Sequence, residues 1–167
     1  RDVRTAVRWG LLAGVAIVVL QLGFGVVVDE LAPQTGSGTL HAILSTIPLR
    51  FLYGGITEEL LLRWGFMSLV GFVLWATLDR GRETPSDRTM WAAVVVAAFV
   101  FALGHLPAAA TTFTLTPSLV AYIVVGNSVG GIVFGWLFWK RSLEAAMISH
   151  ASVHVVLITV SLASLFI

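Results

Sequence analysis

The sequence predicts an all-α, polytopic integral membrane protein with about five transmembrane helices. Of its 167 residues, 57% are hydrophobic and only 11% are charged, and the mean hydropathy is +0.94. A soluble domain carries roughly 25% charged residues. Residues 9–28 form an uncharged stretch of 20 residues, which is about the length that one crossing requires. Because the net charge is +1 and no long basic tract occurs, we expect no nucleic-acid partner.

The first predicted helix covers residues 8–28 and is followed by a loop that contains Asp29, Glu30 and Pro33. The arginines before it resemble the start of a signal peptide, but the apolar run is too long and no clean small-x-small cleavage site follows. We therefore interpret it as a retained transmembrane helix. Since the chain begins with Arg rather than Met, we expect it to be a piece of a longer protein.

The second predicted helix covers residues 40–78, which is too long for a single crossing. A helix of this length would reach about 58 Å at 1.5 Å per residue. We expect either an overhang beyond the bilayer or a break near Gly65 or Gly71 that leads to an interfacial helix. Pro48 is expected to kink the first half.

Three further helices are predicted after a polar connector at residues 79–89. The third covers residues 90–106 and is expected to end at Pro107, followed by an uncharged loop. The fourth covers residues 118–139 and the fifth residues 142–167. Glycines recur along the fourth helix at a spacing that permits close helix contact: Gly126, Gly130, Gly131 and Gly135.

The basic residues predict the orientation of the chain. Eight of the ten fall on one side of the membrane if the second helix crosses once: Arg1, Arg4, Arg8, Arg80, Arg82, Arg88, Lys140 and Arg141. The opposite loops contain Asp29 and Glu30 and no Lys or Arg. Because cytoplasmic loops carry the excess of Lys and Arg, we expect five crossings with a cytoplasmic N-terminus.

Three ionisable residues fall in the middle of the second helix, namely Glu58, Glu59 and Arg63. Each such group costs roughly 2.5 to 3.5 kcal/mol in hydrocarbon, so it usually pairs or serves a site. Glu59 and Arg63 are four residues apart on one helix face and can pair. Glu58 points about 100° away and is left for chemistry.

Three histidines lie in the later helices, His105 in the third and His150 with His154 in the fifth. His150 and His154 share a helix face. The rise per residue places His105 and His154 near one depth, with His150 one turn closer to the cytoplasm. We expect Glu58, at the middle of the second helix, to join them.

Carboxylates and imidazoles together can hydrolyse a peptide bond. A glutamate can take a proton from water with the help of a histidine, and further donors can stabilise the oxyanion of a tetrahedral intermediate. The same groups, Glu58, His105, His150 and His154, could instead hold Zn²⁺ with one position open for water. The absence of cysteine excludes thiolate ligands and a cysteine nucleophile.

Three motifs in order resemble the intramembrane protease family of CAAX-processing and bacteriocin-processing enzymes, also called the abortive-infection family. They are Glu58-Glu59-x-x-x-Arg63, Phe101-x-x-x-His105 and His150-x-x-x-His154. The resemblance implies a protease core in residues 40–167, preceded by a transmembrane helix and external loop in residues 1–39.

The resemblance also implies roles for these residues. Glu58 would act with His105 on a water, and His150 with His154 would bind the oxyanion. Glu59 and Arg63 would hold the first glutamate, and Phe101 would pack beside the site. His154 departs from the usual Asn or Asp, and it makes metal binding easier than Asn would. The substrates would be CAAX-like tails, leader peptides or other membrane-anchored peptides, cleaved in the plasma membrane of a prokaryote either with Zn²⁺ or without a cofactor.

Two other functions agree with the same residues. A membrane scaffold or bacteriocin-immunity factor could keep the fold without catalysis, and a proton-coupled transporter could use the ionisable cluster, although no inverted repeat is present. Asn127 is interpreted as an interhelical hydrogen bond. Arg50 is expected either to snorkel or to pair with Asp29 or Glu30.

Overall fold

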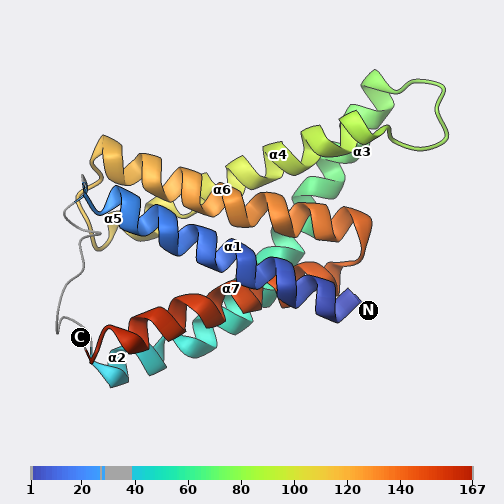
Figure 1. Ribbon diagram of the computed structural model, residues 1–167. Coiled ribbons are helices and arrows are strands. Elements are labelled where there is room, and N and C mark those ends of the chain that lie inside the picture. Colours follow the sequence, from blue (N-terminus) through green and yellow to red (C-terminus); the bar gives the residue numbers. More distant parts are fainter. Residues whose placement is uncertain (1, 27, 29–38, 167) are drawn as a thin grey trace.

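The computed structural model describes residues 2–26, 28 and 39–166, and within this part the chain is helical and forms no strand (Figure 1). Five of its helices are long and apolar enough to cross a membrane, which confirms the predicted number. The predicted loop residues Asp29, Glu30 and Pro33 lie outside the described residues. The elements in order are α1 (Asp2–Phe24), α2 (Leu40–Ser45), η2 (Leu49–Glu58), η3 (Leu60–Met67), α3 (Ser68–Leu78), α4 (Asp87–Gly104), α5 (Leu106–Ala110), α6 (Pro117–Lys140) and α7 (Leu143–Ala163).

Helix α1 packs along α7 and α6 (Figure 1). It begins at Asp2, earlier than the predicted start at residue 8. Its small residues make the contact with α7 close. A Cβ on Gly10 would clash with the Ser149 carbonyl, and one on Gly14 would lie 2.8 Å from Val156 Cβ. Close backbone approach of this kind is how helices gain packing energy inside a bilayer.

The second predicted helix is one continuous run from Leu40 to Leu78. The alternative of a break is wrong, because both Gly65 and Gly71 lie inside the helical run. A backbone that leaves its helix within hydrocarbon would expose unpaired N–H and C=O groups, and this cost exceeds the weak helix propensity of glycine. The second helix is therefore unbroken over its 39 residues.

The middle of this long helix has π-helical hydrogen bonding, in η2 and η3 on either side of Glu59. The change of pattern begins directly after Pro48, which caps η2. Side chains follow the wider turn too, since Ser68 Oγ donates to the Arg63 carbonyl five residues back, at 3.3 Å. Segments of π-helix are rare and occur mostly at functional sites; here Glu58 ends η2 and Glu59 lies between η2 and η3.

Pro107 does not end the third span as predicted. Helix α4 ends at Gly104, His105 follows as its cap, and Pro107 lies in the first turn of the short helix α5. The N–H groups in the first turn of a helix have no acceptor within the helix, so the missing N–H of proline costs nothing there. Proline can therefore start a helix as well as end one. The other end of α4 is capped by Ser86, whose Oγ accepts the N–H of Thr89 at 3.3 Å.

Helices α4 and α6 are in close contact at the predicted glycines. A Cβ on Gly131 would lie 2.8 Å from the Cα of Ala98, and one on Gly135 would lie 3.1 Å from a methyl group of Val94. The prediction of close helix contact is confirmed at Gly131 and Gly135, whereas a Cβ on Gly126 would meet only Tyr122 of its own helix. This contact brings α4 and α6 together near the middle of the bundle.

The basic residues gather at one end of the bundle. Figure 1 shows the N-terminus, the connection between α3 and α4, and the turn between α6 and α7 at the same end. Two exposed ion pairs join these segments, Lys140 with Asp87 at 3.5 Å and Arg141 with Asp2 at 3.2 Å. The structure thus agrees with the predicted clustering on one side.

Candidate active site

A fully buried ion pair lies at the centre of the bundle. Glu59 and Arg63 are both 0% exposed, and Arg63 NH1 lies 3.2 Å from Glu59 Oε1. The same carboxylate oxygen accepts a hydrogen bond from His150 Nδ1 at 2.9 Å. Arg63 also donates to the carbonyl of Gly131 at 3.2 Å. The predicted pairing of Glu59 with Arg63 is confirmed, and it extends to His150 of α7.

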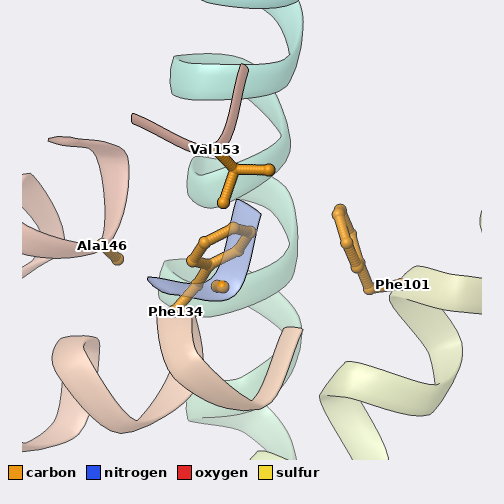
Figure 2. Close-up of a cluster of buried hydrophobic side chains, with 5 residues drawn as sticks. Phe101, Phe134, Ala146 and Val153 are labelled. Carbon is orange, nitrogen blue, oxygen red and sulfur yellow. The ribbon is translucent and has the colours of Figure 1, made fainter. Parts of the chain in front are cut away.

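Aromatic rings enclose this pair. The Arg63 guanidinium lies 4.6 Å from the ring centre of Phe101 and 5.3 Å from that of Phe134. Figure 2 shows Phe101 of α4 facing Phe134 of α6, which lies beside Val153 of α7. Phe134 stacks on the His150 ring at 4.5 Å with an interplanar angle of 17°. We predicted a packing role for Phe101 but not for Phe134, whose one sequence signal is its position among the glycines of α6.

Glu58 occupies a different environment from its neighbour Glu59. Its side chain is 18% exposed, and Oε2 lies 3.9 Å from His150 Nε2. That distance is too long for a direct hydrogen bond, but one water molecule can contact both atoms. Glu58 therefore keeps free lone pairs next to the imidazole that Glu59 holds.

The contact with Glu59 fixes how His150 can act. A carboxylate oxygen only accepts, so His150 Nδ1 carries the proton of that hydrogen bond. In the neutral ring Nε2 is then an acceptor, and it becomes a donor only when the ring is doubly protonated. The two glutamates flank the ring, with Glu59 at Nδ1 and Glu58 on the side of Nε2.

His105 is oriented in the same manner by the backbone. Its Nδ1 lies 2.8 Å from the Phe101 carbonyl one turn earlier, so this nitrogen donates and Nε2 is left as an acceptor. The ring also lies against Phe101, with centroids 4.7 Å apart. Glu58 lies within electrostatic range of His105 without a direct hydrogen bond between them among the described contacts.

His154 is half-buried, and both of its ring nitrogens are buried without a hydrogen bond to any described residue. Its ring stacks on His150 at 4.9 Å and lies against the backbone of Gly54, where a Cβ would approach His154 Nε2 to 2.7 Å. Only glycine leaves space for the ring at that position. Since a buried polar group without a partner costs free energy, the ring is poised to bind water or a substrate atom.

A small cavity joins these histidines. Its volume is about 140 Å³, room for several ordered waters. Polar groups on its wall come from α4, α6 and α7, and α1 contributes Ile17, so the first helix is part of the site. The polar residues that line it are His105, Tyr122, Asn127, His150 and His154.

Two polar residues of the cavity wall extend or correct the sequence interpretation. Asn127 does not form the predicted interhelical bond, because its side-chain N–H donates to the Ile123 carbonyl of its own helix at 2.8 Å. Asn127 nevertheless lines the cavity. Tyr122 was not predicted, since a single tyrosine four positions before Gly126 carries no functional signal in a membrane span.

The zinc hypothesis requires Glu58 and the three histidines to converge on one point. Within the described residues, no group of three or more His, Asp or Glu side chains is arranged to hold a metal ion. His150 engages Nδ1 with Glu59 and His105 engages Nδ1 with the backbone, which leaves Nε2 as the free nitrogen of each ring, the orientation also found in metal-ligating histidines. The described side chains are therefore not gathered into a zinc site, and the chemistry of the cluster is that of its carboxylates and imidazoles.

Together these features define a class of protein, namely a polytopic membrane protein with a glutamate and histidine cluster inside its helical bundle. Residues 39–156, more than half of the chain, match the family described as Type II CAAX prenyl endopeptidase Rce1-like. The chain belongs to this family, which confirms the resemblance found in its three motifs. No curated protein and no solved structure matches it. Family membership indicates a membrane protease that acts on a peptide substrate.

Proposed function

We propose that this protein is an intramembrane endopeptidase that hydrolyses a peptide bond in membrane-anchored substrates with a water activated by Glu58. The observation that carries the proposal is the pairing of a charge-compensated glutamate, Glu59, with an adjacent glutamate that keeps free lone pairs beside His150. A catalytic base needs a free carboxylate held in a fixed position. The Glu59–Arg63 pair supports that position.

In the proposed first step, Glu58 takes a proton from a water molecule that it shares with His105. The oxygen of this water forms a bond to the carbonyl carbon of the scissile peptide, and the carbonyl π electrons move to its oxygen. The acceptor state of His105 Nε2 supports this role, because it can accept the second hydrogen bond of the water. Both groups orient one lone pair of the water toward the substrate.

In the proposed second step, the oxyanion is stabilised by His154 and by doubly protonated His150. Donors directed at developing charge in a site that excludes bulk water act strongly on the rate. The unsatisfied nitrogens of His154 and the flanking glutamates of His150 support this assignment. The proton on Glu58 then passes to the amide nitrogen as the C–N bond breaks, which yields a carboxylic acid and an amine, and the acid then transfers its proton to the amine.

Glu59, Arg63 and Phe101 are proposed as positioning residues. Glu59 orients His150 through its Nδ1, Arg63 neutralises Glu59, and the Phe101 ring lies on both Arg63 and His105. None of the three needs to touch the substrate. Residues 40–167 then form the protease core that follows the N-terminal helix.

We propose that the basic end of the bundle faces the cytoplasm of a prokaryote, in the plasma membrane. The clustering of Lys and Arg at one end supports this orientation. Because the chain has no cysteine, a single cysteine at position 83 reports directly on sidedness. We expect a membrane-impermeant maleimide to label it only after the cells are permeabilised. Labelling of intact cells would show that the proposed orientation is wrong.

Cleavage of a panel of membrane-anchored peptides by purified protein tests the function. We expect E58Q to lose at least about 10²-fold in kcat, since general-base catalysis contributes about 10² to 10⁴, whereas E83Q, at an exposed connector glutamate, should retain full activity. Each protein is assayed with and without a strong chelator. Activity that survives chelation supports the water mechanism, and loss that Zn²⁺ restores would overturn it in favour of a metal.

A scaffold function makes the opposite prediction for the same variant. If no peptide is cleaved and E58Q keeps the cellular phenotype of the wild type, the endopeptidase proposal is wrong.

A further inference from the structure

A groove of about 520 Å³ runs along the outward face of α1, and the proposed chemistry does not use it. Helix α1 packs on α6 and α7 with its opposite face, where Ala6 and Ala13 are buried (Figure 1). The residues of the groove recur at spacings that place them on one helix face, and they are Arg4, Val7, Arg8, Leu11, Leu12 and Val15. Leu11, Leu12 and Val15 are 40 to 52% exposed. The groove therefore has a basic end and an apolar end.

The groove has about the length of one bilayer leaflet. From Arg4 to Val15 the helix rises about 16 Å, and half of the hydrocarbon core is about 15 Å thick. Trp9 follows Arg8 directly, and its ring packs against that of Trp136 with centroids 5.4 Å apart. Because tryptophan side chains prefer the boundary between headgroups and hydrocarbon, this pair places the arginines at the level of the headgroups and the apolar end among the acyl chains.

The charges at the basic end are not neutralised within the groove. None of the described residues that line it is acidic. Asp2, the acidic residue nearest in sequence, pairs with Arg141 at 3.2 Å. The two acidic residues outside the described part, Asp29 and Glu30, follow Val28 in the sequence, and Val28 is buried at the opposite end of α1, where its N–H bonds to the last turn of the helix. The two guanidinium groups therefore attract an anion from outside the protein.

A second groove on the membrane-facing surface differs in charge. It lies between η2 and α7, has a volume of about 340 Å³, and has Glu144 as the one charged residue among the described residues of its wall. Glu144 lies in the first turn of α7, which begins at the basic end of the bundle (Figure 1). The two grooves share an apolar lining but carry charges of opposite sign. Of the two, the α1 groove is the one that complements a negative headgroup.

From this charge complementarity we infer that the α1 groove binds an anionic phospholipid of the leaflet at the basic end. Its phosphate lies on Arg4 and Arg8, since a guanidinium pairs with a phosphate through two parallel N–H bonds. One acyl chain lies along Leu11, Leu12 and Val15. A zwitterionic headgroup also carries a phosphate, but its ammonium finds no carboxylate among the described residues of the groove. The site lies outside the residues that match the family and does not depend on the proposed hydrolysis.

Native mass spectrometry of the purified protein, titrated with phosphatidylglycerol or phosphatidylcholine, tests the inference. Each basic group near an anionic lipid contributes roughly fivefold to affinity, so we expect the wild type to bind phosphatidylglycerol about 20-fold more tightly. R4Q/R8Q should reduce this preference to near one. R4K/R8K should retain part of it, because lysine also binds phosphate, as a point charge.

The matched control is R80Q/R82Q, which removes the same charge from exposed positions of the connector at the same end of the bundle. It should keep the preference of the wild type. Equal binding of the two lipids by the wild type would overturn the inference. An equal loss of preference in R80Q/R82Q would do so too, since the preference would then follow net charge rather than the groove.

Thermal unfolding in nanodiscs gives a second measure that needs no peptide cleavage. A ligand that binds only the folded state raises its stability. Replacing part of the phosphatidylcholine by phosphatidylglycerol should raise the unfolding midpoint of the wild type and of R80Q/R82Q, but not that of R4Q/R8Q. In phosphatidylcholine alone the three proteins should unfold at the same temperature, because the replaced arginines are exposed.

Two other occupants of the groove give different results. Glycerol 3-phosphate, which has the phosphate without the acyl chains, should leave the midpoint unchanged, and a rise equal to that with phosphatidylglycerol would replace the lipid by a free phosphate. A wild-type dimer in detergent that R4Q/R8Q dissociates would assign the groove to a second copy of the chain. Either result would overturn the inference.

Discussion

The two glutamates at positions 58 and 59 are neighbours in sequence, but they differ in burial and in charge pairing. Glu59 is 0% exposed and shares one oxygen between Arg63 and His150. Glu58 is partly exposed and has no direct hydrogen bond among the described residues. The helix turns by about 100° between them, so one carboxylate points into the bundle and the other toward the site. The cluster therefore has two halves. Glu59 with Arg63 forms a charge-paired half that holds His150 in place, and Glu58 with His154 forms an open half that is available to react.

The largest expected effect comes from breaking the charge-paired half. R63M leaves Glu59 buried without its counter-charge, and removing one partner of a buried pair costs about 3 to 5 kcal/mol. We expect a large fall in the thermal unfolding midpoint in detergent. K140M removes the lysine charge from the exposed pair with Asp87 and should cost less than about 1 kcal/mol.

The double variant R63M/E59L sharpens this result. Replacing both members of a buried pair by apolar residues is often close to neutral, so we expect it to recover most of the stability while activity stays low, because His150 loses its orienting acceptor. If R63M were as stable as K140M, the division of the cluster into two halves would be wrong.

The open half should respond in the opposite direction. His154 carries two ring nitrogens without described partners, so H154L is expected to hold or raise stability, by about 1 kcal/mol. At the same time it should lower kcat by about 10² to 10³, the usual effect of losing one oxyanion donor. H154N keeps a donor and should remain within about tenfold of wild type. Unfolding midpoints and peptide cleavage measured on the same preparations check both expectations.

A loss of stability in H154L comparable with that of R63M would contradict the comparison, since it would place His154 among the structural residues.

The smallest expected effect concerns Asp79, a carboxylate that is paired outside the membrane. The Ser86 N–H donates to its Oδ2 at 2.7 Å and the Thr89 hydroxyl at 2.6 Å. These bonds, that of Ser86 first, hold the pKa of Asp79 below its usual value. The pKa of Asp79 in the folded state is lower than the unfolded value of about 3.9. The Asp79 carboxylate therefore stabilises the folded state above pH 4, and this stabilisation is lost as the pH falls below that value.

We therefore expect D79N to lower the unfolding midpoint slightly at pH 7 and to match wild type near pH 3. E83Q, at an exposed position of the same connector, should show no such dependence. A D79N difference that is constant from pH 7 to pH 3 would mean that the carboxylate charge is not what stabilises the connector.

Several features of the protein follow from its sequence alone. Apolar runs define five spans because the thickness of the bilayer sets their length, and these spans are confirmed. The spacing of Glu59 and Arg63 defines a pair because residues four apart face each other on any helix. The glycines of α6 indicate close contact for the same local reason, and three motifs in order identify the family.

Relations between helices depend on packing that no single helix encodes. Only the tertiary structure stacks Phe134 on His150 and forms the hydrogen bond between His150 and Glu59. It also leaves the ring nitrogens of His154 without a partner among the described residues. It also decides that the long helix continues through Gly65 in π-helical form and that Asn127 bonds within its own helix. Helical periodicity determines which residues share a helix face. Which two faces meet is determined by how side chains from distant parts of the chain pack together.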